Sequence, residues 1–564
     1  MRRAAGLLAL SAAVIGAVLT AGPVLADQKP PAAAPASAGA QAPATAQSVE
    51  AQAVSRPARP APFVELVAAS GTGRLYTADP RELASATAAG FKRQPGTTGF
   101  IGRSAKTGWT ALYRLKPSAT ASTWLFTSST QERDALVAQH WVLEGTAGYV
   151  ATKPGTGLVE LRRFTNGKEW RLALAAKTDE LLKAGYKLDG PVGYVYQNWV
   201  RAGAVYFGMF NTHGHGTIIA RTKEIYGRDN DWWGGVRDFH DGTHYATDNW
   251  PGEDWSYLKP SIGYYDDSKP ETLEKHITQA TSAGLSFFNF YWYWDNTKQA
   301  QTVTADSLNA FLQARNRESI DFTVGVCAHP YDQLKIPATQ YDAVATNLMR
   351  YLRQDNTLRT NDGRKILNIC DARGLGDGSN AQVKQFVDTV RAKARGQLGE
   401  DIYVMINQAG FDPKQVGNAG ADAPYCTTDG PAVESRSYTT YLKGQRAFYN
   451  QAPAAYGRCV LSDFDERPRY PIETTDVKAI RWMPDQSLDG YRTAVRNAAA
   501  DMATSTRPSI VDNYLFLYAW NEWHEGGIIE PNERDGCAYL NILHSELSLQ
   551  GPGCVANPQG TPPS

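Results

Sequence analysis

Short apolar runs, each followed by polar residues, recur through the carboxyl-terminal two thirds of the chain. Apolar runs of roughly four to eight residues are typical of buried strands. Eight such strands are predicted, at residues 205–210, 286–293, 322–327, 366–370, 402–406, 421–425, 459–462 and 514–520. Apolar residues at helical spacing lie between most of them, at 271–283, 340–353, 381–394, 435–450 and 488–504. This alternation predicts an α/β fold, a (β/α)₈ TIM barrel with inserted loops.

The carboxyl ends of the predicted strands carry polar and aromatic residues. In a (β/α)₈ barrel the chemistry takes place at these ends. The residues there are His213, His215, Tyr291, Trp292, Tyr293, Trp294, Asp295, His329, Asp371, Arg373, Asn407, Gln408, Tyr425, Asp463, Asp465, Arg467, Asn521 and Glu522. Strand ends are exposed and are therefore enriched in polar residues in any case. The number of polar and aromatic residues on this one face nevertheless favours a functional site.

The amino-terminal part of the chain has a different pattern. Arg2 and Arg3 precede an apolar stretch at 7–19, and 24–26 fits a small-x-small cleavage site, so residues 1–26 are predicted to be a signal peptide rather than a membrane anchor. No later stretch is long and apolar enough to span a bilayer. Residues 27–62, rich in Ala and Pro, are predicted to be a disordered linker. We therefore expect a secreted or periplasmic protein, with no membrane contact after signal cleavage.

Residues 63–198 contain a pattern that recurs three times. Each copy has an apolar strand, then a glutamate (Glu82, Glu132 or Glu180), then a Gly-x-x-Gly segment starting at residue 96, 145 or 190. No single copy can bury its apolar face, so three copies are predicted to form one small α+β accessory domain. The pattern resembles a threefold repeat module of unknown function found on secreted bacterial hydrolases. Its predicted role is cell-surface or glycan attachment, and the alternative is a purely structural appendage. The barrel domain is then 199–564.

The composition of the chain further limits the range of possible functions. Lysine plus arginine and aspartate plus glutamate both number 57, so the net charge is zero, which argues against nucleic acid as a partner. Aromatic residues make up 11% of the chain. Aromatic rings build cores, but they also stack on sugar rings. A carbohydrate polymer is therefore a reasonable substrate class.

Six cysteines in an exported chain can form disulfides. The connectivity is open from sequence, with Cys537–Cys554 as the first expectation, while Cys327 and Cys370 lie in apolar runs that would suit buried thiols. No Cys-x-x-Cys motif is present. His213, His215, His240 and His244, or Asp266, Asp267 and Asp535, are weak indications of a metal. We expect neither a metal nor a cofactor.

Two carboxylates follow the last apolar run three residues apart, Glu522 and Glu525. His524 lies between them, and Trp520 and Trp523 flank them. Paired carboxyl groups among tryptophans, just after a buried strand, are suited to acid/base chemistry on a sugar. The alternative, a pair of surface acids in a loop, is favoured where no such context exists.

The barrel region resembles the glycoside hydrolase family 99-like clan, which includes endo-α-mannosidases, mannanases and WbsX-like glycosyltransferases. The resemblance spans residues 230–545 and is strongest at the end. It rests on Asn230-Asp231-Trp232-Trp233-Gly234, Pro260-Ser261-Ile262-Gly263-Tyr264-Tyr265-Asp266, Ala283-Gly284-Leu285-Ser286-Phe287-Phe288, Tyr291-Trp292-Tyr293-Trp294, Asp463-Phe464-Asp465-Glu466-Arg467-Pro468-Arg469 and Ala519-Trp520-Asn521-Glu522-Trp523-His524-Glu525-Gly526. The chain carries the Glu-Trp-His-Glu form of the hydrolases. It departs from the WbsX-like pattern at Cys327-Ala328-His329-Pro330, where Trp-Ala-Asn-Glu is usual.

The resemblance implies a retaining hydrolase that needs no metal. Glu522 would be the base that removes the proton from the sugar 2-hydroxyl, and Glu525 would be the general acid and later the base, with a raised pKa. Substrate binding is expected of Asn521, Trp523, His524, Tyr265, Tyr291, Trp292, Tyr293, Asp465 and Arg467. For the aromatic residues the alternative is barrel packing, and for Asp465 and Arg467 it is a salt bridge within a loop. A glycosyltransferase and a non-catalytic glycan-binding protein remain as rival functions.

Overall fold

The computed structural model describes residues 60–558 except 95–97, 156–157, 198, 211–231, 331–332, 409–410, 427–434, 452–454, 470–479, 505–510 and 512. The predicted signal peptide, most of the predicted linker, and His213 and His215 lie outside the described residues.

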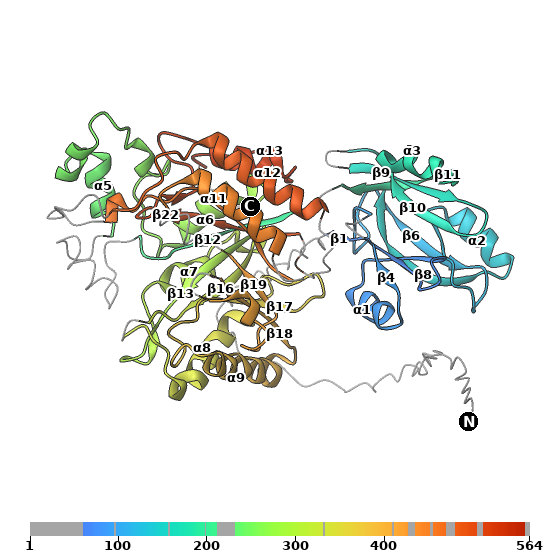
Figure 1. Ribbon diagram of the computed structural model, residues 1–564, viewed down its shortest axis with the longest axis horizontal. Helices are drawn as coiled ribbons and strands as arrows, with labels where there is room; N and C mark the ends of the chain where they lie inside the picture. The colour runs from blue at the N-terminus through green and yellow to red at the C-terminus, as the bar shows by residue number, and fades with distance from the viewer. Residues whose placement is uncertain are drawn as a thin grey trace, which may run out of the picture. The chain divides into compact units, whose positions relative to one another are not determined.

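Eight strands form one parallel sheet in the described part of the chain, in the order β19-β18-β17-β16-β13-β12-β21-β20 (Figure 1). Their bounds are β12 (Arg201–Tyr206), β13 (Phe287–Trp292), β16 (Asp321–Cys327), β17 (Lys365–Asp371), β18 (Ile402–Asn407), β19 (Ala423–Tyr425), β20 (Arg458–Leu461) and β21 (Tyr514–Tyr518). Short pairs β14 (Trp294–Asp295) with β15 (Ala300–Gln301), and β22 (Asn521–Glu522) with β23 (Gly527–Ile528), extend from it. The predicted barrel is confirmed.

The two ends of this sheet meet at Gly457. Tyr425 and Gly457 form a parallel bridge, and the Gly457 amide donates to the carbonyl of Pro424 at 2.8 Å. A Cβ atom at Gly457 would lie 2.7 Å from the ring of Phe516, so the close approach that joins the ends needs a residue without a side chain. The sheet is therefore a nearly closed barrel.

The first barrel strand differs most from its prediction, because it begins and ends four residues earlier. Its first residue, Arg201, is buried and donates to Asp321 at 2.6 Å and to the carbonyl of Arg359 at 2.7 Å. Since a charged residue opens the strand, the apolar run understates its length. Residues 207–210 are buried but lie beyond the ladder.

Helices surround the barrel strands and supply most of the outer core. All five predicted helices are present, with ends shifted by up to four residues. The bounds of the described helices are α5 (Gly234–His240), α6 (Pro270–Ser282), α7 (Ala305–Phe311), α8 (Tyr341–Leu352), α9 (Asn380–Leu398), α11 (Tyr438–Gln451), α12 (Leu488–Thr504) and α13 (Ala538–Glu546). Helix α6 begins with Pro270 and Glu271, residue types suited to the first turn of a helix.

The amino-terminal region has the order strand, helix, strand at three places. Its helices are α1 (Pro80–Ala88), α2 (Thr130–Ala138) and α3 (Thr178–Lys183), and its strands are β1 (Ala61–Pro62), β2 (Val64–Val67), β3 (Arg74–Thr77), β4 (Lys92–Arg93), β5 (Phe100–Ile101), β6 (Trp109–Lys116), β7 (Leu125–Thr127), β8 (Val142–Ala151), β9 (Leu158–Thr165), β10 (Trp170–Leu174) and β11 (Lys187–Tyr196). Strand β1 lies at the end of the predicted linker, so ordered structure starts slightly earlier than expected.

Helix capping explains two of these three places. The side chain of Asp79 accepts from the amide of Arg81, and that of Ser129 accepts from the amide of Glu132. Each cap satisfies an amide that the first turn of a helix leaves without a partner. Helix α3 has no side-chain cap.

All six cysteines of the chain pair, as Cys327–Cys370, Cys426–Cys459 and Cys537–Cys554. The third pairing confirms the first expectation. The expectation of free thiols at Cys327 and Cys370 is wrong, because the neighbouring strands β16 and β17 bring their Cα atoms within 4.7 Å. An apolar run reveals burial, but it does not reveal which buried cysteines are neighbours. Among the described residues, no helix has the length and hydropathy needed to cross a membrane.

The Cys426–Cys459 disulfide is expected to stabilise the barrel at the point where its sheet closes. It links residues 33 apart in the chain, beside the single bridge between Tyr425 and Gly457. Replacing both cysteines by alanine should lower the free energy of unfolding by about 3–4 kcal/mol, because the unfolded chain gains entropy. Urea unfolding followed by tryptophan fluorescence measures this loss. Unchanged stability would show that the bridge at Gly457 closes the barrel unaided.

Candidate active site

A tight hairpin at the carboxyl end of β21 holds both candidate catalytic glutamates. Glu522 lies in β22, which pairs with β23, and the amide of Glu525 donates to the carbonyl of Glu522 at 2.9 Å. Gly526 has a φ of 66°, and a Cβ atom there would lie 2.7 Å from Asp465. The turn therefore needs a glycine directly after Glu525. This local geometry brings the two carboxyl groups to one end of the barrel.

Glu525 is held by two hydrogen-bond donors. The guanidinium of Arg469 donates to one carboxylate oxygen, and the hydroxyl of Tyr518 donates to the other. The side chain of Glu525 is 18% exposed and that of Arg469 is 36% exposed, so this side of the pair is open to solvent. A carboxylate with a cation and a phenol as donors is stabilised in its charged form.

The two glutamates differ in their electrostatic surroundings. Burial and the negative charge of Glu525 raise the pKa of Glu522 well above its usual value. Burial also opposes ionisation of Glu525, but the charge of Arg469 and the hydrogen bonds from Tyr518 and Arg469 outweigh it and lower the pKa of Glu525. Of the two carboxyl groups, Glu522 therefore keeps its proton to higher pH than Glu525. The expected raised pKa of Glu525 is wrong for this resting state.

Two tyrosines from β13 and the residue after it lie at the same end of the barrel. Burial and the charges of Glu522 and Glu525 raise the pKa of Tyr293 well above its usual value, which places its hydroxyl near the pair. Tyr291 points into the barrel, since a Cβ atom at Gly325 of β16 would lie 3.3 Å from its ring. Contact of both tyrosines with a sugar stays a prediction.

Trp292, between them, points the other way. Its indole nitrogen donates to Gln301 at 3.3 Å, and Gln301 also accepts from Tyr351 of helix α8. Successive side chains of a strand face opposite sides of a sheet, so Trp292 packs against the helical layer. The expectation that Trp292 binds substrate is therefore wrong.

Asn521 and Tyr265 support the hairpin through buried hydrogen bonds. Both ends of the Asn521 amide bond the backbone of Phe207, at 2.8 and 2.9 Å. The hydroxyl of Tyr265 donates to Glu530 at 2.8 Å, and the other oxygen of Glu530 lies 3.0 Å from His276. All these side chains are buried. Asn521 and Tyr265 are thus structural residues, which corrects their expected contact with substrate.

Trp523 and His524 are also buried behind the carboxyl pair. The ring of Trp523 lies 5.8 Å from that of Trp233. His524 donates from Nε2 to the carbonyl of Trp232 at 2.7 Å, and burial lowers its pKa to about 4. The neutral imidazole helps to orient the hairpin, and the substrate contact expected of Trp523 and His524 stays a prediction.

Asp465 and Arg467 form a salt bridge within the loops, the second of the two interpretations considered above. Arg467 bonds Asp465 and Glu253 at 2.7 Å, and Asp465 also accepts from Tyr257 at 2.7 Å. Three tryptophans surround the guanidinium within 5.0 Å of their ring centroids, namely Trp250, Trp255 and Trp482. Arg467 is buried, and its donors are used by these partners. These contacts favour the salt-bridge interpretation over an anchor for the substrate.

Two residues of the site, Arg469 and Tyr518, were not predicted from sequence. Arg469 stands in the quoted Asp463-to-Arg469 block, but nothing in the spacing pairs it with Glu525. Tyr518 lies in an apolar run, where a tyrosine is equally suited to packing. Alternation along β21 does not reveal the contact either, because the strand ends at Tyr518 and Glu525 lies in the turn beyond it.

The candidate metal ligands have other partners where they are described. His240 lies 2.6 Å from Asp241, and His244 stacks on Phe239 with centroids 4.5 Å apart. Asp267 accepts from the amide of Phe210 at 3.0 Å. Within the described ranges, no group of three or more His, Cys, Asp or Glu side chains is arranged to hold a metal ion.

Fold and site together define an α/β-barrel protein with a buried carboxyl pair at the carboxyl ends of its strands. A family model described as "Glycosyltransferase WbsX" matches residues 332–543, and one described as "Domain of unknown function (DUF5648)" matches residues 62–196 and 126–215. Part of the barrel thus resembles the WbsX family, and the amino-terminal region resembles DUF5648.

Individual relatives are distant. The uncharacterized protein WxcX of Xanthomonas campestris pv. campestris is 22% identical over 352 residues, which are 57% of this chain and 48% of WxcX. The chain thus spans about half the length of the curated relatives it matches. Similar solved structures include a glycoside hydrolase-like protein (15% identity, 62% of this chain and 94% of the other, TM-score 0.40) and the GH99 endo-alpha-mannosidase of Bacteroides thetaiotaomicron (16%, 59% and 88%, TM-score 0.39).

The structural role of Arg467 can be tested by substitution. Arg467→Met leaves the buried Asp465 without its cation, so the free energy of unfolding should fall by about 3–5 kcal/mol. Arg496→Met, at an arginine 62% exposed on helix α12, is the matched control and should change little. Chemical denaturation measures both. Unchanged stability of Arg467→Met with weakened sugar binding would restore a direct substrate contact.

Proposed function

We propose that this protein is a secreted, retaining glycoside hydrolase that cleaves a polysaccharide or glycan, in the manner of an endo-α-mannosidase or mannanase. The observation that supports this most strongly is the Glu522–Glu525 pair at the end of a barrel strand, where the pKa of one carboxyl group is raised and that of the other is lowered. Glycoside hydrolysis needs one protonated and one ionised carboxyl group. Tyr291 and Tyr293 would contact the sugar beside the pair.

The proposed reaction assigns the two glutamates the roles implied by the resemblance. Glu522 accepts the proton of the sugar 2-hydroxyl while the 2-oxygen attacks the anomeric carbon, and Glu525 protonates the departing oxygen. Water then attacks the anomeric carbon and gives its proton to Glu525, while Glu522 returns a proton to the 2-oxygen. The two displacements give net retention.

These roles require the shared proton to move. In the resting state the proton is on Glu522, because Arg469 stabilises the charge of Glu525. Arg469 is partly exposed, so a bound sugar can displace its guanidinium from Glu525. Loss of that cation raises the proton affinity of Glu525, and the proton then passes to the residue that acts as general acid.

A glycosyltransferase is the second candidate, supported by the description of the matching family. Transfer and hydrolysis would use the same carboxyl pair and differ in the acceptor, a sugar or water. The three disulfides support export, since disulfides persist in oxidising compartments. Sugar donors activated by a nucleotide are not expected there, which favours hydrolysis. The amino-terminal domain would attach the enzyme to a glycan or cell surface.

A polysaccharide panel with product sizing tests the proposed function. Purified protein should release shorter saccharides from at least one polymer, α-mannan being the first to try. Glu522→Gln and Glu525→Gln should each slow this release by about a hundredfold to ten-thousandfold. Products longer than the substrate would indicate transfer. Full turnover by either variant would contradict the assignment.

Aryl glycosides separate the roles of the two glutamates. A dinitrophenolate leaving group needs little protonation, so Glu525→Gln should keep much of its activity on an activated aryl glycoside of the sugar found in the panel. Glu522→Gln should stay inactive on the same compound, because the attacking 2-oxygen still needs a base. The reverse result would exchange the two roles.

The pH dependence of kcat/KM should change when Arg469 is replaced. The active form holds one proton on the pair, so activity falls at low pH as the ionised carboxyl group gains a proton. Arg469 lowers the pKa of Glu525, and Arg469→Gln removes that effect. The acid limb of the kcat/KM profile should therefore move to higher pH. Arg469→Lys keeps the charge and should keep the limb near its original position. An unchanged limb in Arg469→Gln would contradict the account.

A further inference from the structure

We propose that His329 is a specificity-determining residue that accepts a hydrogen bond from a sugar hydroxyl beside the Glu522–Glu525 pair. This inference rests on the proposed function, because it assumes that a glycan occupies the site. It deepens that function by naming the contact: a neutral hydroxyl donor on the sugar.

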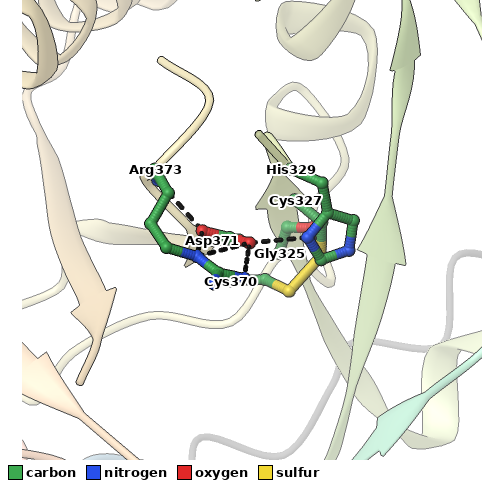
Figure 2. Close-up of a disulfide and its surroundings, with 6 residues drawn as sticks. All are labelled: Gly325, Cys327, His329, Cys370, Asp371 and Arg373. Atoms are coloured by element: carbon green, nitrogen blue, oxygen red, sulfur yellow. Dashed lines mark hydrogen bonds and ion pairs between the residues drawn. A yellow bond between two sulfur atoms is a disulfide. The ribbon is translucent and has the colours of Figure 1, made fainter. Parts of the chain in front are cut away.

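A cross-link between two barrel strands fixes the backbone segment that carries His329. Figure 2 shows the Cys327–Cys370 disulfide joining the carboxyl ends of β16 and β17, with His329 two residues after Cys327 and Asp371 directly after Cys370. The amide of Ala328 donates to the carbonyl of Asp371 at 2.9 Å. The two segments are thus joined both covalently and through the backbone.

Gly374 fixes the backbone of His329 more tightly. Its amide donates to the carbonyl of Ala328 at 2.7 Å, and a Cβ atom at this position would lie 2.2 Å from the carbonyl oxygen of His329. Only a glycine allows this approach. A histidine mounted on such a rigid base is positioned before any ligand arrives, which reduces the entropy lost on binding.

The imidazole of His329 is oriented by a carboxylate. Its Nδ1 lies 2.5 Å from Oδ2 of Asp371, which also binds Arg373 through two nitrogens (Figure 2). Burial opposes the charge of Asp371, but the bonds from His329 and Arg373 outweigh it and lower the pKa of Asp371 to about 2. Asp371 is therefore an ionised acceptor, and Nδ1 of His329 carries the proton. In the neutral ring, Nε2 is then the acceptor.

The ring lies next to the proposed catalytic centre. Its centroid is 5.4 Å from that of Tyr293, and Tyr293 experiences the charges of Glu522, Glu525 and Asp371 together. The His329 side chain is 26% exposed, whereas that of Asp371 is 4% exposed. The carboxylate is thus the buried anchor, and the imidazole is the part within reach of a ligand.

The hydrogen-bonding capacity of the His329 imidazole determines which kind of ligand can bind there. Sugar hydroxyls are donors with fixed directions on a ring, and a rigid acceptor discriminates between epimers that present the hydroxyl differently. Tyr293 adds an aromatic face beside it, suited to the C–H face of a pyranose. A neutral sugar that places a hydroxyl against Nε2 is the expected occupant.

Binding without turnover tests this inference independently of hydrolysis. In a Glu525→Gln background, calorimetry measures the affinity for α-mannotetraose, cellotetraose and xylotetraose. At least one should bind, and adding His329→Ala should weaken it about tenfold or more. His140→Asn, at an exposed histidine with a φ of 67° in the amino-terminal domain, is the matched control and should bind normally. Failed hydrolysis with intact binding would overturn only the reaction.

A spectroscopic readout separates a sugar contact from a merely structural role. The imidazole ¹⁵N resonances of His329 should show the Nδ1–H tautomer, and adding the bound tetrasaccharide should shift Nε2 but not Nδ1. Asp371→Asn should weaken the tautomer preference and the binding together. Binding unaffected by His329→Ala, a ligand-insensitive Nε2, or no binding by any of the three tetrasaccharides would overturn the inference.

Discussion

The arrangement of the site depends on one constraint: two carboxyl groups influence each other at one end of the barrel, and the guanidinium of Arg469 bonds one of them, Glu525. Arg469 and Tyr518 stabilise negative charge on Glu525, and Glu522 has no comparable donor among the partners described above. Two like charges at such a place are too costly, so the pair keeps one proton. Burial, together with the charges of both glutamates, raises the pKa values of Tyr293 and Tyr518 well above the usual value for a phenol.

Several polar residues around the pair hold the hairpin in place. Asn521 joins the hairpin to the backbone of Phe207, directly after β12. The hydrogen bond from Tyr265 to Glu530 joins the segment after the hairpin to the loop before helix α6. Arg467, enclosed by tryptophans, fixes the loop that delivers Arg469. Burying such polar groups is favourable only when they are hydrogen-bonded, as the side chains of Asn521, Tyr265 and Arg467 are. A rigid support of this kind suits a site whose chemistry depends on the position of one proton.

Sequence patterns predict the fold well and the site in part. The eight strands are visible as apolar runs, and the motif around Glu522 and Glu525 is visible from residue types alone. The direction in which a side chain points is not visible from residue types. Trp292 and Asn521 were therefore expected in the site, although Trp292 packs outward and Asn521 bonds the backbone of Phe207. Partnerships between distant segments, such as Arg469 with Glu525, depend on loops whose path no local pattern encodes.

The position of the shared proton is the most direct test of this account. ¹³C NMR of protein labelled at glutamate Cδ, with Glu522→Gln and Glu525→Gln to assign the two resonances, follows each carboxyl group through a pH titration. The account predicts that the Glu525 carboxyl group ionises below the usual range for glutamate, whereas Glu522 stays protonated above that range. Two resonances that titrate together within the usual range, or in the opposite order, would contradict it.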